Sequence, residues 1–136
     1  MEGSQKPLPL ILARNLITSI GTPAFVVDES ARLLFYNEAA GALLGMAFED
    51  AGRMEPERWS QTFGPFDEEG KPVPIEELPL TMALRDGHPA HSRFLIHSAN
   101  GAERRIEASA LPLVATDEEP SGAMVIFWPL DGKPSK

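Results

Sequence analysis

Residues 23–45 read PAFVVDESARLLFYNEAAGALLG, and three structural elements follow one another within this stretch. Two runs rich in β-branched and aromatic residues, 22–28 and 32–36, are separated by a short polar break. This pattern predicts two strands joined as a hairpin. Asn37 then precedes small and apolar residues at helical spacing, which predicts an N-cap at Asn37 and a C-terminal stop at Gly45. The stretch is therefore expected to fold as strand, strand and helix.

The chain before this stretch predicts an amphipathic N-terminal helix over residues 8–20. Its main apolar positions are spaced by three or four residues, as on one face of a helix: Leu10, Ala13, Ile17 and Ile20. Such a helix either covers a sheet or forms half of a dimer contact, and these four residues are the predicted contact. The polar ends 1–7 and 132–136 are expected to be flexible, which leaves 21–131 as the main domain.

The chain after this stretch predicts another helix and three more strands. Residues 79–86, with Pro first and Gly directly after them, fit a helix. Two strand-like runs flank Asn100-Gly101, a dipeptide typical of a type I′ hairpin turn. The last run, AMVIFW at 123–128, is apolar on both faces and predicts a central strand covered on both sides. The order predicts an α+β fold, in which helices pack on one face of a five-stranded antiparallel sheet.

Three parts of the chain together resemble a PAS domain. Residues 23–45 resemble the opening hairpin and helix of that family, and 78–113 (LPLTMALRDGHPAHSRFLIHSANGAERRIEASALPL) resemble its long helix, hairpin and following strand. Residues 121–131 (SGAMVIFWPLD) are similar to its last strand. The resemblance implies a sheet backed by helices that often encloses a small-molecule pocket, and a sensor or dimerisation role in signalling proteins. On this basis 21–131 is a PAS-like sensor domain without catalysis of its own.

Charge and cysteine content exclude several classes of partner and cofactor. Twelve Lys and Arg face twenty Asp and Glu, and the net charge of −8 disfavours nucleic acid and anionic membranes, which bind clustered basic residues. The chain has no Cys, so within the PAS family it excludes the Cys-adduct flavin of light-oxygen-voltage domains and a thioester-linked chromophore. The N-terminus lacks a secretory signal pattern, and the apolar stretch 8–20 is shorter than the roughly 20 residues of a membrane span. A cytoplasmic location is expected.

The three histidines, His88, His91 and His97, are candidate metal or haem ligands. The resemblance makes haem an alternative, because some PAS sensors hold haem iron through one histidine, and His88 is the best placed because it follows the predicted long helix. No metal site is predicted otherwise, because His88 and His91 lack further ligands nearby. No nucleophile with a base, phosphate-binding glycine loop or pair of catalytic acids is recognisable, so no catalytic residue is predicted and any cofactor is left unidentified.

An apolar interior remains as the candidate ligand site. Ala108 and Ala110 on a central strand leave space for a small apolar or aromatic ligand. Asn37 is weighed both as an N-cap and as a side chain that contacts the ligand. The predicted lining consists of Phe25, Val27, Phe35, Asn37, Trp59, Phe63, Met82, Phe94, Ile96, Ile106, Ala108, Met124 and Ile126.

Two functions are compatible with these observations. The first is a sensor that binds a small, mainly apolar molecule in this interior. The second is a ligand-free module that forms a homodimer or docks a signalling partner protein through the helix at 8–20 and the outer face of the sheet. The two are compatible with each other, since one domain can bind a ligand and pair through its helix.

Overall fold

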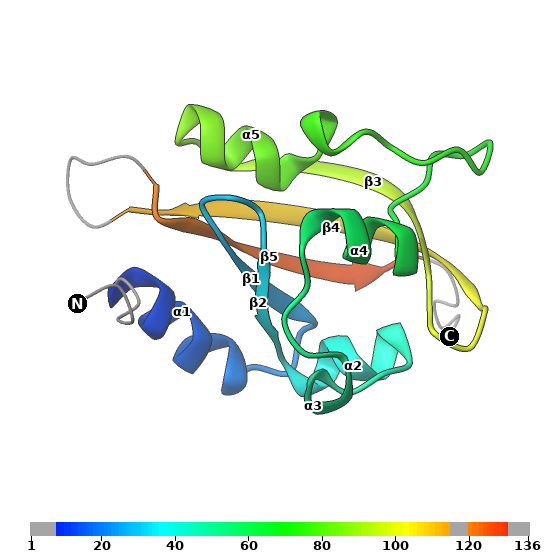
Figure 1. Cartoon of the computed structure of the whole chain (residues 1–136), viewed down its shortest axis with the longest axis horizontal. Coiled ribbons are helices and arrows are strands. Elements are labelled where there is room, and N and C mark those ends of the chain that lie inside the picture. The colour runs from blue at the N-terminus through cyan, green and yellow to red at the C-terminus, as the bar shows by residue number, and fades with distance from the viewer. Residues whose placement is uncertain (1–7, 115–119, 131–136) are drawn as a thin grey trace.

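The computed structural model describes residues 8–114 and 120–130, and the described residues form one five-stranded sheet with helices on both faces (Figure 1). The predicted flexible ends 1–7 and 132–136 lie outside the described residues. Neighbouring strands are all antiparallel, in the order β2-β1-β5-β4-β3. Along the chain the elements are α1 (Leu8–Thr18), β1 (Ala24–Asp28), β2 (Leu33–Tyr36), α2 (Glu38–Leu44), α3 (Phe48–Ala51), α4 (Pro56–Thr62), the short 3-10 helix η1 (Ile75–Glu77), α5 (Pro79–Asp86), β3 (Ala90–His97), β4 (Glu103–Leu113) and β5 (Gly122–Pro129).

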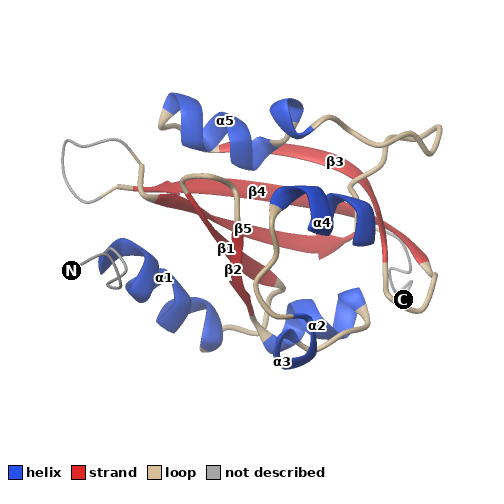
Figure 2. Cartoon of the chain, in the orientation of Figure 1, coloured by secondary structure: helices blue, strands red, loops and turns tan. Residues whose placement is uncertain are grey.

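Strand β5 is central and is buried on both faces, which confirms its predicted place. Val125 and Phe127 belong to the larger buried cluster, which the sheet forms with residues of α2, α4 and α5. Met124 belongs to a second cluster, on the other face, in which Leu10 and Ile17 of α1 pack on the sheet. Figure 2 shows α1 on one side of the strands and α4 and α5 on the other. The N-terminal helix therefore covers the sheet face that the other helices leave open.

The side chain of Asn37 connects three elements at the end of β2. Its Oδ1 accepts from Ala40 N at 2.9 Å, as predicted for an N-cap, and also from Ala24 N at 3.1 Å. Its Nδ2 donates to Ile17 O at 2.8 Å and to Thr22 O at 2.9 Å. Helix α1 ends at Thr18, two residues before the predicted end at residue 20. The buried amide thus ties α1, β1 and α2 together.

The predicted type I′ turn at Asn100-Gly101 is wrong. Only Gly101 of the two has a positive φ, 92°, and its N–H donates to Ser98 O at 2.9 Å. The side chain of Asn100 accepts from Ala102 N at 3.1 Å, which holds the turn in a longer form with a single left-handed residue. The first hairpin repeats this geometry, with Ala31 (φ 66°) in the left-handed position.

The segment after α4 runs along the free edge of β3. Phe66 N donates to Leu95 O at 2.8 Å, and Leu95 N donates to Phe66 O at 2.9 Å. A further bond joins His97 N to Phe63 O at 2.9 Å. These bonds satisfy part of an exposed strand edge, and they hold the segment from Phe63 to Phe66 over one end of the sheet.

Candidate functional site

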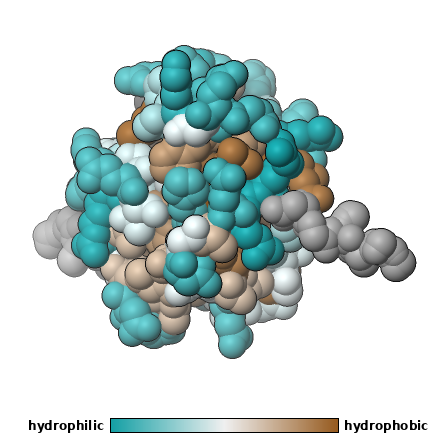
Figure 3. Space-filling view, turned by 90° about the vertical axis from the view of Figure 1, so that its right-hand side faces the viewer, coloured by the Kyte–Doolittle hydropathy of each residue, from teal (hydrophilic) through white to brown (hydrophobic). Residues whose placement is uncertain are grey.

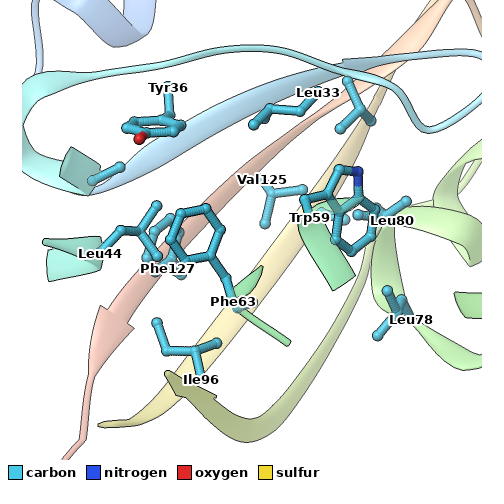
Figure 4. Close-up of a cluster of buried hydrophobic side chains, with 14 of the residues drawn as sticks. Leu33, Tyr36, Leu44, Trp59, Phe63, Leu78, Leu80, Ile96, Val125 and Phe127 are labelled. Atoms are coloured by element: carbon cyan, nitrogen blue, oxygen red, sulfur yellow. The ribbon is translucent and has the colours of Figure 1, made fainter. Parts of the chain in front are cut away.

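A cavity of about 90 Å³ lies between the sheet and the segments around α4 and the start of α5. Figure 4 shows lining side chains that converge on it from β2, α2, α4, α5 and the central strands. Every lining side chain is hydrocarbon apart from one phenol and one indole. The lining residues are Phe25, Leu33, Tyr36, Leu44, Trp59, Phe63, Gly64, Pro65, Leu78, Pro79, Leu80, Phe94, Ile96, Ile106, Ala108, Val125 and Phe127.

The two lining side chains with a polar group use that group outside the cavity. The Tyr36 hydroxyl donates to Met46 O at 2.6 Å, and Trp59 Nε1 donates to Ala31 O at 3.0 Å. Burial raises the pKa of Tyr36 to about 12, and the charges of Asp50 and Glu49 add to this shift, so the phenol is neutral at ordinary pH. The lining side chains therefore present neither a charge nor an unpaired hydrogen-bonding group to whatever occupies the cavity.

The sequence located part of this lining. Seven predicted residues line the cavity: Phe25, Trp59, Phe63, Phe94, Ile96, Ile106 and Ala108. They are aromatic or apolar residues of the strands, of α4 or of its C-terminal end. In β3 the side chains alternate between the two faces, since Phe94 and Ile96 line the cavity and His91 and His97 do not.

Six predicted lining residues lie elsewhere. Phe35, Met124 and Ile126 belong to the cluster on the α1 face of the sheet, because alternate residues of a strand point to opposite faces. Val27 is buried in the larger cluster without lining the cavity, and Asn37 is occupied with its backbone bonds. Met82 lies on the outer side of α5 and is 37% exposed.

The sequence missed ten lining residues. Four of them lie in a predicted strand or helix: Leu33, Tyr36, Leu44 and Leu80. The other six come from places without a clear signal. Gly64 and Pro65 belong to an irregular segment, and Leu78 and Pro79 stand at the entrance to α5. Val125 and Phe127 were missed because β5 is apolar on both faces, so its sequence does not tell which set of alternate residues faces the cavity. Helix α1 packs on the face that contains Met124, so Val125 and Phe127 are the residues that face the cavity.

Haem does not fit this site. Its iron needs an axial ligand, and none of the three histidines lines the cavity in the described part of the chain. His88, the histidine best placed for the haem alternative, lies in the turn after α5. His97 stacks on Phe66 with ring centroids 4.2 Å apart, and its Nε2 lies 3.7 Å from Glu103 Oε2. A volume of 90 Å³ is also well below the roughly 300–1,000 Å³ of pockets for drug-sized ligands. Among the described residues, no group of three or more His, Asp or Glu is arranged to hold a metal ion.

Charged groups pair at the surface, away from the cavity. Arg32 Nε donates to Glu55 Oε2 at 2.8 Å, and Arg105 pairs with Glu68. Figure 3 shows hydrophilic residues over much of one face of the molecule, with hydrophobic residues between them. Exposed pairs of this kind contribute little stability, so we assign them no part in the site.

The comparison with protein families gives a direct result. The family model described as "PAS fold" matches residues 17–131. The chain belongs to the PAS family. PAS domains are generally sensory modules of signalling proteins rather than catalysts. None of the helices in the described ranges has the length and apolarity that crossing a bilayer requires.

Solved PAS domains share the fold of this chain. The Rhodobacter sphaeroides LOV protein matches with a TM-score of 0.72 and 13% identity over 96% of this chain and 72% of that one. The PAS domain of the fruit-fly ELK potassium channel matches with a TM-score of 0.68 and 10% identity over 89% and 96%. The PAS domain of Bordetella pertussis BvgS matches with a TM-score of 0.56 and 19% identity over 89% and 84%. A search of curated proteins gave no match.

Proposed function

We propose that this PAS domain is a sensor that binds a small apolar molecule in the cavity between its sheet and helices. The observation that carries the proposal is the apolar cavity itself, which lies within an otherwise buried core. An unfilled cavity of this size lowers stability by about 2 kcal/mol, at about 24 cal/mol per Å³. A ligand that fills the space recovers part of that free energy and stabilises the folded state.

The cavity is placed where occupancy can affect structure elsewhere. Phe63, Gly64 and Pro65 line it, and the same segment is bonded to the edge of β3 through Phe66. A ligand against these residues favours the packed arrangement of this segment over looser ones, as expected for a sensor. The lining side chains contain no nucleophile, and their one titratable group, Tyr36, is neutral. Binding without chemistry is therefore the proposed activity.

Xenon tests whether the cavity takes up a guest, because this atom enters apolar cavities regardless of hydrogen-bonding groups. We expect xenon to shift NMR signals of residues that line the cavity in the wild-type chain. Ala108 is 3% exposed and lies in the lining, so Ala108→Leu fills the space and removes these shifts. Ala42→Leu makes the same change on the exposed side of α2 and is expected to keep them. Xenon shifts that are absent from the wild type, or that persist in Ala108→Leu, contradict the proposal.

We further propose that the chain forms a homodimer through α1. Of the four predicted contact residues, Leu10, Ala13 and Ile17 are buried against the sheet, and Ile20, beyond the end of α1, is partly buried against the same cluster, so all four face the chain's own core. A different stripe of the helix is exposed and apolar: Leu8 at 63%, Ile11 at 42%, Leu12 at 56% and Leu16 at 52%. Helix α1 has no acidic residue, although the chain carries a net charge of −8, and its single charged residue, Arg14, places its guanidinium 4.3 Å from the centre of the Phe35 ring. Two copies therefore meet there with little electrostatic repulsion, in a symmetric contact.

Light scattering of the full chain tests this contact. The wild type is expected to be a dimer, and Leu12→Glu with Leu16→Glu is expected to be a folded monomer, because both side chains are exposed. Ala42→Glu, which adds a charge on α2, is the control and should remain dimeric. A monomeric wild type overturns the homodimer and leaves the stripe to a signalling partner of different sequence.

A further inference from the structure

We propose that the cavity selects an uncharged hydrocarbon of a single ring, such as benzene or toluene. This inference rests on the proposed sensor function and names the class of its ligand. It follows from three properties of the cavity: the state of its polar groups, its volume and the nature of its walls.

The polar groups of the lining exclude ligands that need a hydrogen bond. Tyr36 donates to Met46 O and Trp59 donates to Ala31 O, so neither donor is directed at a guest. A guest hydroxyl in this cavity gives up its bonds to water without a partner among the side chains. A guest with a carboxylate or an amine either enters the cavity as an ion or changes its protonation first, and both cost further free energy. Polar metabolites and flavin are thus outside the class.

The volume limits the ligand to one ring. An engineered apolar cavity of roughly 150 Å³ takes up benzene. The cavity here is smaller, at about 90 Å³, so a single ring already requires its walls to move outward slightly. Two fused rings require much larger displacements of close-packed side chains, which a rigid interior opposes.

The walls favour an aromatic guest over a saturated one. Six lining residues are aromatic: Phe25, Tyr36, Trp59, Phe63, Phe94 and Phe127. Phe25 and Phe127 already meet in a tilted arrangement, with centroids 5.8 Å apart and an angle of 57° between the rings. Aromatic rings gain from tilted and edge-to-face contacts beyond the area that they bury. A guest ring therefore adds to a set of contacts that the lining itself uses.

Calorimetric titration of the full chain with a matched panel tests the class. Toluene and phenol are nearly the same size and differ in a methyl against a hydroxyl group. We expect toluene to bind, and we expect the affinity for phenol to be at least about 10-fold lower. Benzoate and naphthalene are expected to show no heat of binding. Cyclohexane is expected to bind more weakly than benzene.

A variant with a polar wall provides the control. Val125 is 3% exposed and lines the cavity, and Val125→Thr adds a hydroxyl at almost constant shape. The preference for toluene over phenol should shrink in this variant, because phenol then has a partner. Equal or tighter binding of phenol, benzoate or naphthalene by the wild type overturns the inference. A wild type that takes up xenon but binds neither toluene nor benzene also overturns the inference, and the sensor function then remains. A wild type that takes up no xenon overturns both the inference and the sensor function.

Discussion

The side-chain nitrogen of Asn37, Nδ2, donates a hydrogen bond to the carbonyl oxygen of Ile17, 2.8 Å away and twenty positions earlier in the chain. The same side chain caps α2, so one buried residue, 3% exposed, holds the end of α1 against the start of α2. Helix α1 is thus bonded to the domain as well as packed on it. We expect this junction to contribute to the stability of the domain.

Replacing Asn37 by Ala is expected to lower the free energy of unfolding by about 3 kcal/mol or more. Loss of an N-cap alone accounts for about 1 kcal/mol, and buried groups left without a partner account for about 1–3 kcal/mol each. Urea denaturation measures the change. Asn100→Ala, in an exposed turn where the side chain accepts from Ala102 N and from the Ser98 hydroxyl, is the control, with a smaller expected loss of about 1–2 kcal/mol. Equal losses in the two variants contradict the role assigned to the Asn37 junction.

The size of the cavity is expected to control stability in both directions. Leu80, 4% exposed, lines the cavity, and Leu80→Ala should lower the free energy of unfolding by about 3 kcal/mol. Ala108→Leu should raise it by about 1 kcal/mol, because it fills existing space. Met82→Ala, on the exposed side of α5 and outside the lining, is the control and should change it by less than about 0.5 kcal/mol. A large loss in Ala108→Leu would show that the space is not available.

Tyr36 is expected to ionise late and to make stability fall at alkaline pH. Its pKa is raised to about 12 in the folded chain, against an ordinary value of 10.0. Between these values the unfolded chain releases the phenolic proton and the folded chain retains it, so unfolding becomes more favourable as pH rises. The chain has a single Tyr, so tyrosinate absorbance reports on this group alone. A midpoint near 10 in the folded protein contradicts the prediction, and Tyr36→Phe should remove this contribution to the pH dependence.

Gly122 is expected to tolerate no side chain. A Cβ at this position would lie 2.2 Å from Val27 O and 2.6 Å from Leu10 Cδ2, where β5 pairs with β1 and α1 packs on the sheet. Gly122→Ala should lower the free energy of unfolding by about 2–3 kcal/mol, because backbone or helix must move. A Cβ at Gly21 meets no atom within 4 Å, so Gly21→Ala is the matched control and should be neutral or slightly stabilising. Comparable stability of the two variants excludes the close approach.

Local interactions made much of this fold predictable from the sequence. The N-cap at Asn37 and the glycine that ends α2 depend on residues only a few positions apart, so their pattern is visible in the chain. Helix α5 begins at Pro79 and ends at Asp86 for the same kind of reason. The apolar character of residues 123–128 on both faces was sufficient to place β5 at the centre of the sheet.

Tertiary contacts decided the questions that depend on which elements face each other. Helical spacing marked Leu10 and Ile17 as one apolar face, but only the sheet beneath α1 shows that this face is buried and that Leu12 is on the exposed side. Alternation separated Met124 from Val125 without telling which of them borders the cavity. The cavity itself arises because side chains far apart in sequence stop short of filling the space between sheet and helices. Its shape is a property of packing, which periodicity along a single chain does not contain.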